Sequence, residues 1–314
     1  MSNTANPIWS ILGAGAIGSL WGSYAQRSDQ STELIFRDRR SLAAYRQHGG
    51  INFTAGAKTE LLNIAACCPE TIKAPIQQLL ITTKAQQTLT ALQAIETHIL
   101  PKASLVILQN GLGIAEQVQA QFPHANIYQA STTEGAYRPQ PFAVVHAGRG
   151  QTLIGHANTK GLTPQLSSIA KALSFSPLAV SPNSNIKAVL WRKLAINCAI
   201  NPLTAIYRCR NGELLDKPAA LAQMSSVVNE ILELSKALGL DQELADLHQQ
   251  VIEVARATGN NRSSMLQDIE AGRETEIDAI TGYLCQLATK QGLSLPCNQQ
   301  LLDEVRRISP QNHH

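Results

Sequence analysis

The chain has 314 residues, a length that favours two domains because one domain usually holds roughly 100–200 residues. Hydrophobic residues make up 44% of it and charged residues 16%, so the chain can bury a sizeable core. Lys and Arg number 26 against 23 Asp and Glu, a formal charge of +3 without a long block of one sign. This balance argues against nucleic acid or an anionic membrane as the main partner.

Membrane, export and metal signals are absent from the sequence. No apolar stretch approaches the roughly 20 residues that cross a bilayer, and the N-terminus lacks a basic segment followed by an apolar one. The six cysteines show no C-x-x-C spacing and the eight histidines no H-E-x-x-H motif. We therefore expect a cytoplasmic protein without structural disulfides and without a metal site.

The first half alternates short apolar runs with segments of helical periodicity, as a βαβ chain with a mostly parallel sheet does. The pattern predicts strands at Ile8–Leu12, Leu34–Phe36, Leu79–Thr82 and Leu105–Leu108, and helices at Ala16–Gln26, Gln87–Thr97 and Ile114–Gln121. From Ile127 to Gly155, short strand-like pieces (Ala143–Val145, Thr152–Ile154) are separated by Gly and Pro. They indicate an antiparallel extension at the edge of the sheet.

A segment rich in Pro, Ser and Asn, Ser174–Asn185, separates this half from the next. We place the domain boundary there, with residues 1–183 in one domain and 184–314 in the other. In the second part the apolar residues recur at helical spacing, in Val189–Ile200, Ala219–Leu238, Leu244–Thr258 and Ile277–Lys290. The C-terminal domain is therefore predicted to be all-helical.

A glycine motif stands directly after the first predicted strand and opens the first predicted helix: Gly13-Ala14-Gly15-Ala16-Ile17-Gly18. In G-x-G-x-x-G the first glycine permits a tight turn, the second admits a pyrophosphate, and the third lets helix and strand pack closely. The helix N-terminus offers free N–H groups to phosphate. The context favours a Rossmann-type dinucleotide-binding domain over a tight turn without a ligand.

The end of the second strand decides which dinucleotide binds. An acidic residue there hydrogen-bonds the ribose 2′-OH of NAD, whereas an arginine meets the 2′-phosphate of NADP. Arg37 is the first polar residue after the strand, and Arg39 and Arg40 add positive charge, which favours NADP. Asp38 keeps NAD open, because a slip of one residue would put a carboxylate in that place.

Two further polar residues end predicted strands, where ligands of open α/β sheets bind. Lys84 ends the segment LLITTK, and Asn110 follows the strand SLVILQ. A lysine there could hold a ribose hydroxyl or a carboxylate, and an asparagine could orient a carbonyl. An exposed lysine and an Asn-Gly turn are the alternatives.

In the second half, Lys193, Asn197 and Asn201 recur four residues apart and so share one face of a predicted helix. Burying such a polar stripe is costly unless it meets partners, and a substrate with carbonyl, hydroxyl and carboxylate groups would supply them. A solvent-facing stripe is the alternative. Pro202 is predicted to kink or end this helix.

Two capping boxes are predicted further on, Ser264-x-x-Gln267 and Thr275-x-x-Asp278. They place Ser264 and Glu276 at helix starts. Such positions suit anions and partly buried carboxylates, although simple caps are the alternative.

With these residues in view, the chain resembles the ketopantoate reductase (2-dehydropantoate 2-reductase) family from Ile11 to about Pro296. The likeness is carried by the segments GAGAIG, TTKAQQ, QNGLG, LWRKLAINCAINPLTAI, RNGEL and SSMLQDIEAGRETEID. It implies that NADPH or NADP binds at Gly13–Gly18, Arg37, Lys84, Asn110, Ala136 and Glu276. It implies substrate contacts from Asn110, Asn197, Asn201, Asn211 and Ser264, and proton donation by Lys193.

The resemblance implies an oxidoreductase that reduces 2-dehydropantoate to (R)-pantoate in pantothenate and coenzyme A synthesis, acting as a monomer or homodimer. An NADP-binding Rossmann-type domain would then precede a helical substrate and catalytic domain. One alternative is a related NADP-dependent reductase of another branched 2-keto acid. Another is a non-catalytic NADPH-binding sensor, which the proton donor Lys193 disfavours.

Overall fold

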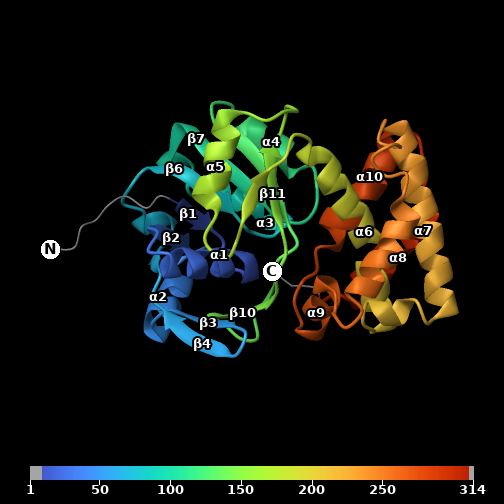
Figure 1. The fold of residues 1–314 in the computed structure, drawn as a ribbon, viewed down its shortest axis with the longest axis horizontal. Helices are drawn as coiled ribbons and strands as arrows, with labels where there is room; N and C mark the ends of the chain where they lie inside the picture. Colours follow the sequence, from blue (N-terminus) through green and yellow to red (C-terminus); the bar gives the residue numbers. More distant parts are fainter. Residues whose placement is uncertain (1–8, 311–314) are drawn as a thin grey trace. The chain divides into compact units, whose positions relative to one another are not determined.

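The computed structural model describes residues 9–310, so Ile8 of the first predicted strand lies outside the described residues. The chain divides into two compact units (Figure 1). The first comprises the residues up to Gln109 together with Ile114–Lys187, and the second comprises Asn110–Gly113 and the residues from Ala188 onward.

The first unit is built on an eight-stranded sheet with the order β12-β11-β8-β7-β6-β1-β2-β5. Its strands are β1 (Trp9–Leu12), β2 (Thr32–Ile35), β5 (Ala65–Cys67), β6 (Ile76–Ile81), β7 (Ile99–Leu108), β8 (Asn126–Thr132), β11 (Thr152–His156) and β12 (Val180–Pro182). Neighbouring strands are parallel except for β8 and β11, which are antiparallel. The predicted parallel α/β sheet is confirmed.

Helices cover both faces of this sheet because its strands are apolar on both sides. Alternate residues of a strand enter opposite cores: Leu80 packs with α1 (Ala16–Arg27) and α5 (Pro164–Leu173), whereas Leu79 and Ile81 pack with α3 (Ala85–Gln93) and α4 (Ile114–Gln121). The continuous apolar runs of the sequence are therefore strands buried on both faces. The predicted helix Gln87–Thr97 is divided into α3 and a 3-10 turn, Glu96–His98.

A second, four-stranded sheet has the order β4-β3-β10-β9 and comprises β3 (Ile51–Ala55), β4 (Lys58–Leu62), β9 (Gly135–Tyr137) and β10 (Ala143–Gly148). The prediction that Ala143–Val145 extends the main sheet is wrong, because β10 pairs in parallel with β3; Thr152–Ile154, in β11, does extend it antiparallel. Strand periodicity identifies a strand but not its partner.

Helix α1 lies between the two sheets (Figure 1). It packs against β1 and β2 on one side and against β3, β9 and β10 on the other. Because both sheets cover α1, every residue from Gly18 to Ala25 is buried. The sequence pattern did not identify the following helix, α2 (Arg39–His48), in which only Leu42 and Tyr45 are buried.

The described elements of the second unit are helical, as predicted. They are α6 (Ile186–Tyr207), which starts in the first unit, α7 (Pro218–Ala237), α8 (Leu247–Ala257), α9 (Ser264–Glu270), α10 (Tyr283–Lys290) and α11 (Pro296–Ile308), with a 3-10 turn at Gly212–Leu214 and a π-helical turn at Asp278–Gly282. None of the helices in the described part of the chain is long and apolar enough to cross a membrane.

Helix α6 continues through Pro202 to Tyr207. Of the predicted kink or end at this proline, the end after Asn201 is therefore wrong. An interior proline costs about 3 kcal/mol through its missing N–H and its ring. Leu203 and Ala205, which follow it, are completely buried in the core of this unit. We attribute the persistence of the helix to this packing.

Candidate active site

The glycine motif forms the turn between β1 and α1. Gly13 has φ +103°, and a Cβ atom added there would lie 3.0 Å from the Thr83 nitrogen. A Cβ on Gly18 would lie 2.0 Å from the Gly13 carbonyl oxygen. The first and third glycines are therefore required by the packing of the chain itself.

The second glycine of the motif, Gly15, is not required by the packing of the chain. A Cβ on Gly15 would meet nothing closer than the Thr82 oxygen at 4.0 Å, and its φ of −75° suits any residue. Gly15 is the N-cap of α1, whose first turn contains no acidic side chain. Space in front of a helix start with N–H groups fits a phosphate group. This turn therefore fits the pyrophosphate of a dinucleotide.

Arg37 and Asp38 follow β2. The Asp38 carboxylate caps α2, because Oδ1 accepts a hydrogen bond from the Ser41 nitrogen at 2.7 Å and Oδ2 accepts one from Arg37 Nε at 2.9 Å. The hydrogen bonds from Ser41, first of all the backbone one, hold the pKa of Asp38 below its usual value. The Arg37 side chain is 84% exposed. The Asp38 carboxylate is engaged as a helix cap, whereas the Arg37 side chain is exposed. This arrangement therefore favours a 2′-phosphate ligand over a ribose hydroxyl.

The end of β6 lies against the glycine turn. The Thr82 hydroxyl donates to the Gly13 carbonyl at 2.7 Å, and Lys84 follows at the N-cap of α3. The Lys84 carbonyl accepts from the Thr88 hydroxyl at 3.1 Å. Lys84 therefore follows, by two residues, a threonine that contacts the glycine turn. Thr82 was not identified from the sequence, since threonine at a strand end has no distinctive pattern.

Strand β9 also reaches this turn. Ala136 lies in β9, and Arg138 immediately after it donates from Nη1 to the Ala14 carbonyl at 3.3 Å. Arg138 was not identified from the sequence, because nothing in the local pattern indicates a contact across 124 residues.

In the second unit, Lys193, Asn197 and Asn201 lie on α6, as predicted. Lys193 and Asn197 are partly buried, and Asn201 is buried. Burial of the Lys193 ammonium lowers its pKa to about 8, although the nearby Glu276 carboxylate acts to raise it. The solvent-facing alternative is therefore wrong for Asn201, whereas Lys193 and Asn197 keep some exposed surface.

Asn110 contacts the same carboxylate, since its Nδ2 donates to Glu276 Oε2 at 3.1 Å. Two glycines allow the segment Asn110–Gly113 to lie close to Ala279 and Tyr283. Gly111 has φ +91° and would place a Cβ 2.7 Å from the Ala279 oxygen, and Gly113 would place one 2.5 Å from the Tyr283 ring. Asn110, Lys193 and Glu276 thus form one polar group.

The start of α9 is tied to α6 by buried hydroxyls. Ser263 is the N-cap and accepts from the Leu266 nitrogen at 3.1 Å, so the prediction of Ser264 as the cap is wrong by one residue. The Thr204 and Ser263 hydroxyls lie 2.7 Å apart. Ser264 is the first residue of α9 and is exposed. The capping box at Thr275 is also wrong, because the helical turn after Glu276 has no side-chain cap.

Asn211 is buried, and its Nδ2 donates to the Thr258 hydroxyl at 2.8 Å. That hydroxyl donates to the Val254 carbonyl, which fixes the orientation of the amide. Within residues 9–310, no donor reaches Asn211 Oδ1. A buried acceptor without a donor is costly, and a ligand hydroxyl would satisfy it.

Comparison with known proteins identifies the family. The family model "Ketopantoate reductase PanE/ApbA" matches residues 9–159, and "Ketopantoate reductase PanE/ApbA C terminal" matches residues 185–309. A 2-dehydropantoate 2-reductase of Vibrio cholerae is 32% identical over 95% of this chain and 96% of its own length. The chain belongs to the ketopantoate reductase family.

Solved structures of similar fold include members of this family and a related activity. A probable 2-dehydropantoate 2-reductase from Bacillus subtilis is 29% identical, with a TM-score of 0.81, covering 96% of this chain and 99% of that one. D-mandelate dehydrogenase, solved with NADH and anilino(oxo)acetate, is 25% identical, with a TM-score of 0.88, covering 96% of this chain and 97% of that one. The fold is therefore shared by enzymes with different substrates.

Proposed function

We propose that this ketopantoate reductase family member reduces the ketone of 2-dehydropantoate to (R)-pantoate with NADPH. The main support is the partly buried Lys193, whose pKa of about 8 lies close to neutral pH, beside Glu276 and Asn110. A general acid works best when its pKa is near the working pH. Relatives named 2-dehydropantoate 2-reductase, similar over almost their full length, support the substrate.

Bound NADPH would supply the hydride that reduces the ketone carbon. Lys193 would stabilise the developing alkoxide and donate its proton to that oxygen. Asn110, Asn197 and Asn201 would hold the keto acid without adding charge, and Ser264 would hold its carboxylate. The free Oδ1 of Asn211 would accept from the substrate hydroxyl. Gly13–Gly18, Arg37, Lys84, Ala136 and Glu276 would hold the cofactor.

The charge of Glu276 should set the pH dependence of reduction. Lys193 donates a proton only as an ammonium, so kcat should fall as the pH rises through the pKa of about 8. Glu276→Gln removes the charge that raises this pKa, and the falling limb should move to lower pH. Profiles of kcat against pH for both proteins check this. The same midpoint in both pH profiles would show that the charge of Glu276 does not raise the pKa of Lys193.

Arg37 should determine the choice of cofactor. Arg37→Ala should lower kcat/KM with NADPH by about tenfold or more while changing kcat/KM with NADH little, since only NADPH carries the 2′-phosphate. Arg307→Ala is the control, because Arg307 is also exposed but lies in the last turn of α11, in the other unit. Equal losses with both cofactors would contradict the assignment of Arg37.

A second candidate function is reduction of another 2-keto acid. The likeness to D-mandelate dehydrogenase with NADH favours it, because the same fold there accepts a different substrate. A non-catalytic NADPH sensor has less support, since a sensor needs no lysine with a pKa of about 8.

Identification of the product tests the proposal directly. The protein is incubated with NADPH and 2-dehydropantoate, and the product is analysed by mass spectrometry and chiral chromatography. We expect (R)-pantoate in amounts equal to the NADP formed. NADPH binding without pantoate would overturn the substrate assignment and leave the cofactor assignment standing.

A further inference from the structure

Arg138 contacts the glycine motif, but the motif itself assigns no role in cofactor binding to an arginine at this place. Its Nη1 donates to the Ala14 carbonyl at 3.3 Å, and the Ser19 hydroxyl donates to the same oxygen at 3.3 Å. Ala14 is the residue between the first two glycines. The carbonyl that precedes Gly15 is therefore held from two sides, by α1 itself and by the segment after β9.

Holding this carbonyl also orients the next N–H group. The peptide between Ala14 and Gly15 is planar and trans, so the Gly15 N–H points opposite to the Ala14 C=O. The carbonyl points toward Arg138, and the N–H therefore points away from it. The guanidinium also adds a fixed positive charge beside a turn that fits phosphate. Arg138 thereby favours a conformation of the turn that presents N–H groups to an anion.

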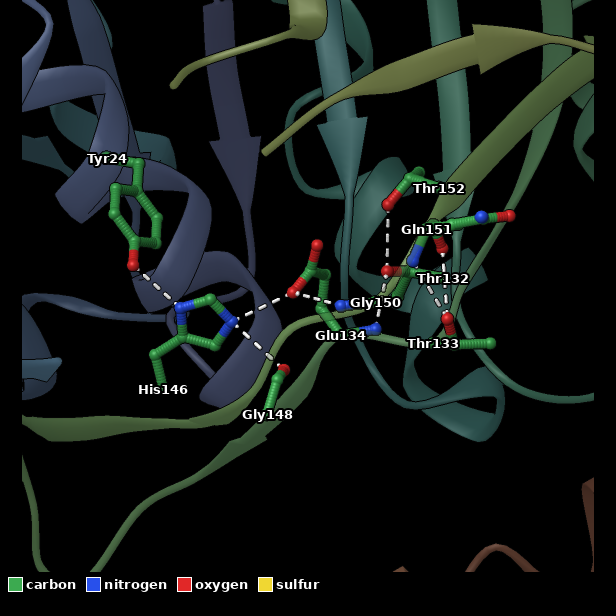
Figure 2. A network of polar contacts seen from close by, with 9 residues as sticks. All are labelled: Tyr24, Thr132, Thr133, Glu134, His146, Gly148, Gly150, Gln151 and Thr152. Atoms are coloured by element: carbon green, nitrogen blue, oxygen red, sulfur yellow. Dashed lines mark hydrogen bonds and ion pairs between the residues drawn. The ribbon is translucent and has the colours of Figure 1, made fainter. Parts of the chain in front are cut away.

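Arg138 follows β9 in the β9–β10 hairpin. A buried network of hydrogen bonds, centred on Glu134 and His146, holds this hairpin (Figure 2). His146 Nε2 lies 2.8 Å from Glu134 Oε2 and 3.0 Å from the Gly148 carbonyl. Both partners are acceptors, so Nε2 carries the proton. Glu134 Oε2 also accepts from the Gly150 nitrogen at 3.0 Å. The carboxylate thus joins both ends of the β9–β10 hairpin, with only 3% of its side chain exposed.

The same network attaches the hairpin to α1. The Tyr24 hydroxyl lies 2.6 Å from His146 Nδ1 (Figure 2). Burial raises the pKa of Tyr24, against the charges of Arg27 and Arg149, so its hydroxyl keeps the proton that it donates to Nδ1. Tyr24 lies on the helix that begins with the glycine turn. The network therefore fixes β9 relative to the helix whose N-terminus faces the cofactor site.

We propose that Arg138 is a positioning residue of the dinucleotide site, and that the Tyr24–His146–Glu134 network holds it against the Ala14 carbonyl. The proposal rests on the proposed binding of NADPH. It assigns to the β9–β10 hairpin a part in cofactor affinity, and it gives a function to the buried hydrogen bonds that join Tyr24, His146 and Glu134.

The first test measures NADPH binding by its fluorescence, without turnover. Arg138→Met should weaken binding by about tenfold, and Arg138→Lys should restore part of the affinity by keeping the charge. KM for the keto acid at saturating NADPH should stay unchanged. Arg256→Met, at an exposed position of α8, controls for the loss of one positive charge. Wild-type affinity in Arg138→Met would overturn the proposal, whereas failure of the wild type to bind NADPH would overturn the proposed function.

A double-mutant cycle tests the role of the network. Tyr24→Phe removes the hydroxyl that reaches His146 and should weaken NADPH binding by about threefold in the wild type. In the Arg138→Met background the same substitution should have little further effect, because the network acts through Arg138. Additive losses would show that Tyr24 affects NADPH binding by a route other than Arg138 and would overturn this part of the proposal.

Discussion

Lys193→Met should lower kcat for 2-dehydropantoate by at least about a hundredfold, the lower range of what a positioned general acid contributes. Methionine keeps most of the side-chain volume but has neither proton nor charge for the alkoxide. NADPH affinity, measured by fluorescence titration, should change little, because Lys193 is assigned to the keto acid. The change should therefore appear in kcat and not in cofactor binding.

Lys187→Met is the matched control for this variant. Lys187 lies on the same helix, α6, but is exposed. The Lys187→Met variant should retain full turnover of 2-dehydropantoate. Turnover of Lys193→Met close to that of Lys187→Met would remove Lys193 from the role of proton donor.

Gly15→Leu should abolish measurable NADPH binding, with a loss of at least about a hundredfold, while the protein stays folded. The side chain would fill the space in front of the α1 N-terminus, where a Cβ meets no atom of the protein closer than 4.0 Å. Titration of NADPH fluorescence gives the affinity, and thermal unfolding gives Tm. We expect an unchanged Tm, because the backbone at Gly15 suits any residue.

Gly18→Ala provides the contrast. Its Cβ would lie 2.0 Å from the Gly13 oxygen, so this variant should lose stability and show a lower Tm. Normal NADPH affinity in a folded Gly15→Leu protein would place the dinucleotide elsewhere. A lower Tm in both variants would mean that Gly15 is kept for packing and not for a ligand.

The sequence predicted those parts of the fold and the candidate site that depend on local spacing. The apolar run of each buried strand, the glycine turn and the polar stripe on α6 are each encoded within about twenty residues. Asn110 was predicted at a strand end and Glu276 at a helix start, and the family resemblance placed both at the cofactor. The structure adds that their side chains touch at 3.1 Å.

The failed predictions have physical causes outside the local pattern. Two adjacent serines offer the same hydroxyl, and only the buried contact with Thr204 distinguishes Ser263 as the cap of α9. Pro202 stays within α6 because the surrounding core outweighs its local effect. Arg138 meets Ala14 only through the pairing of β9 with β10, which no periodicity specifies.

The central claim is the pairing of 2-dehydropantoate with NADPH, and steady-state kinetics test it most directly. kcat/KM is measured for 2-dehydropantoate and for phenylglyoxylate, the keto acid that corresponds to mandelate, each with NADPH and with NADH. We expect kcat/KM for 2-dehydropantoate with NADPH to exceed the kcat/KM of each of the other three combinations by at least about tenfold. Faster reduction of phenylglyoxylate, or a preference for NADH, would contradict it.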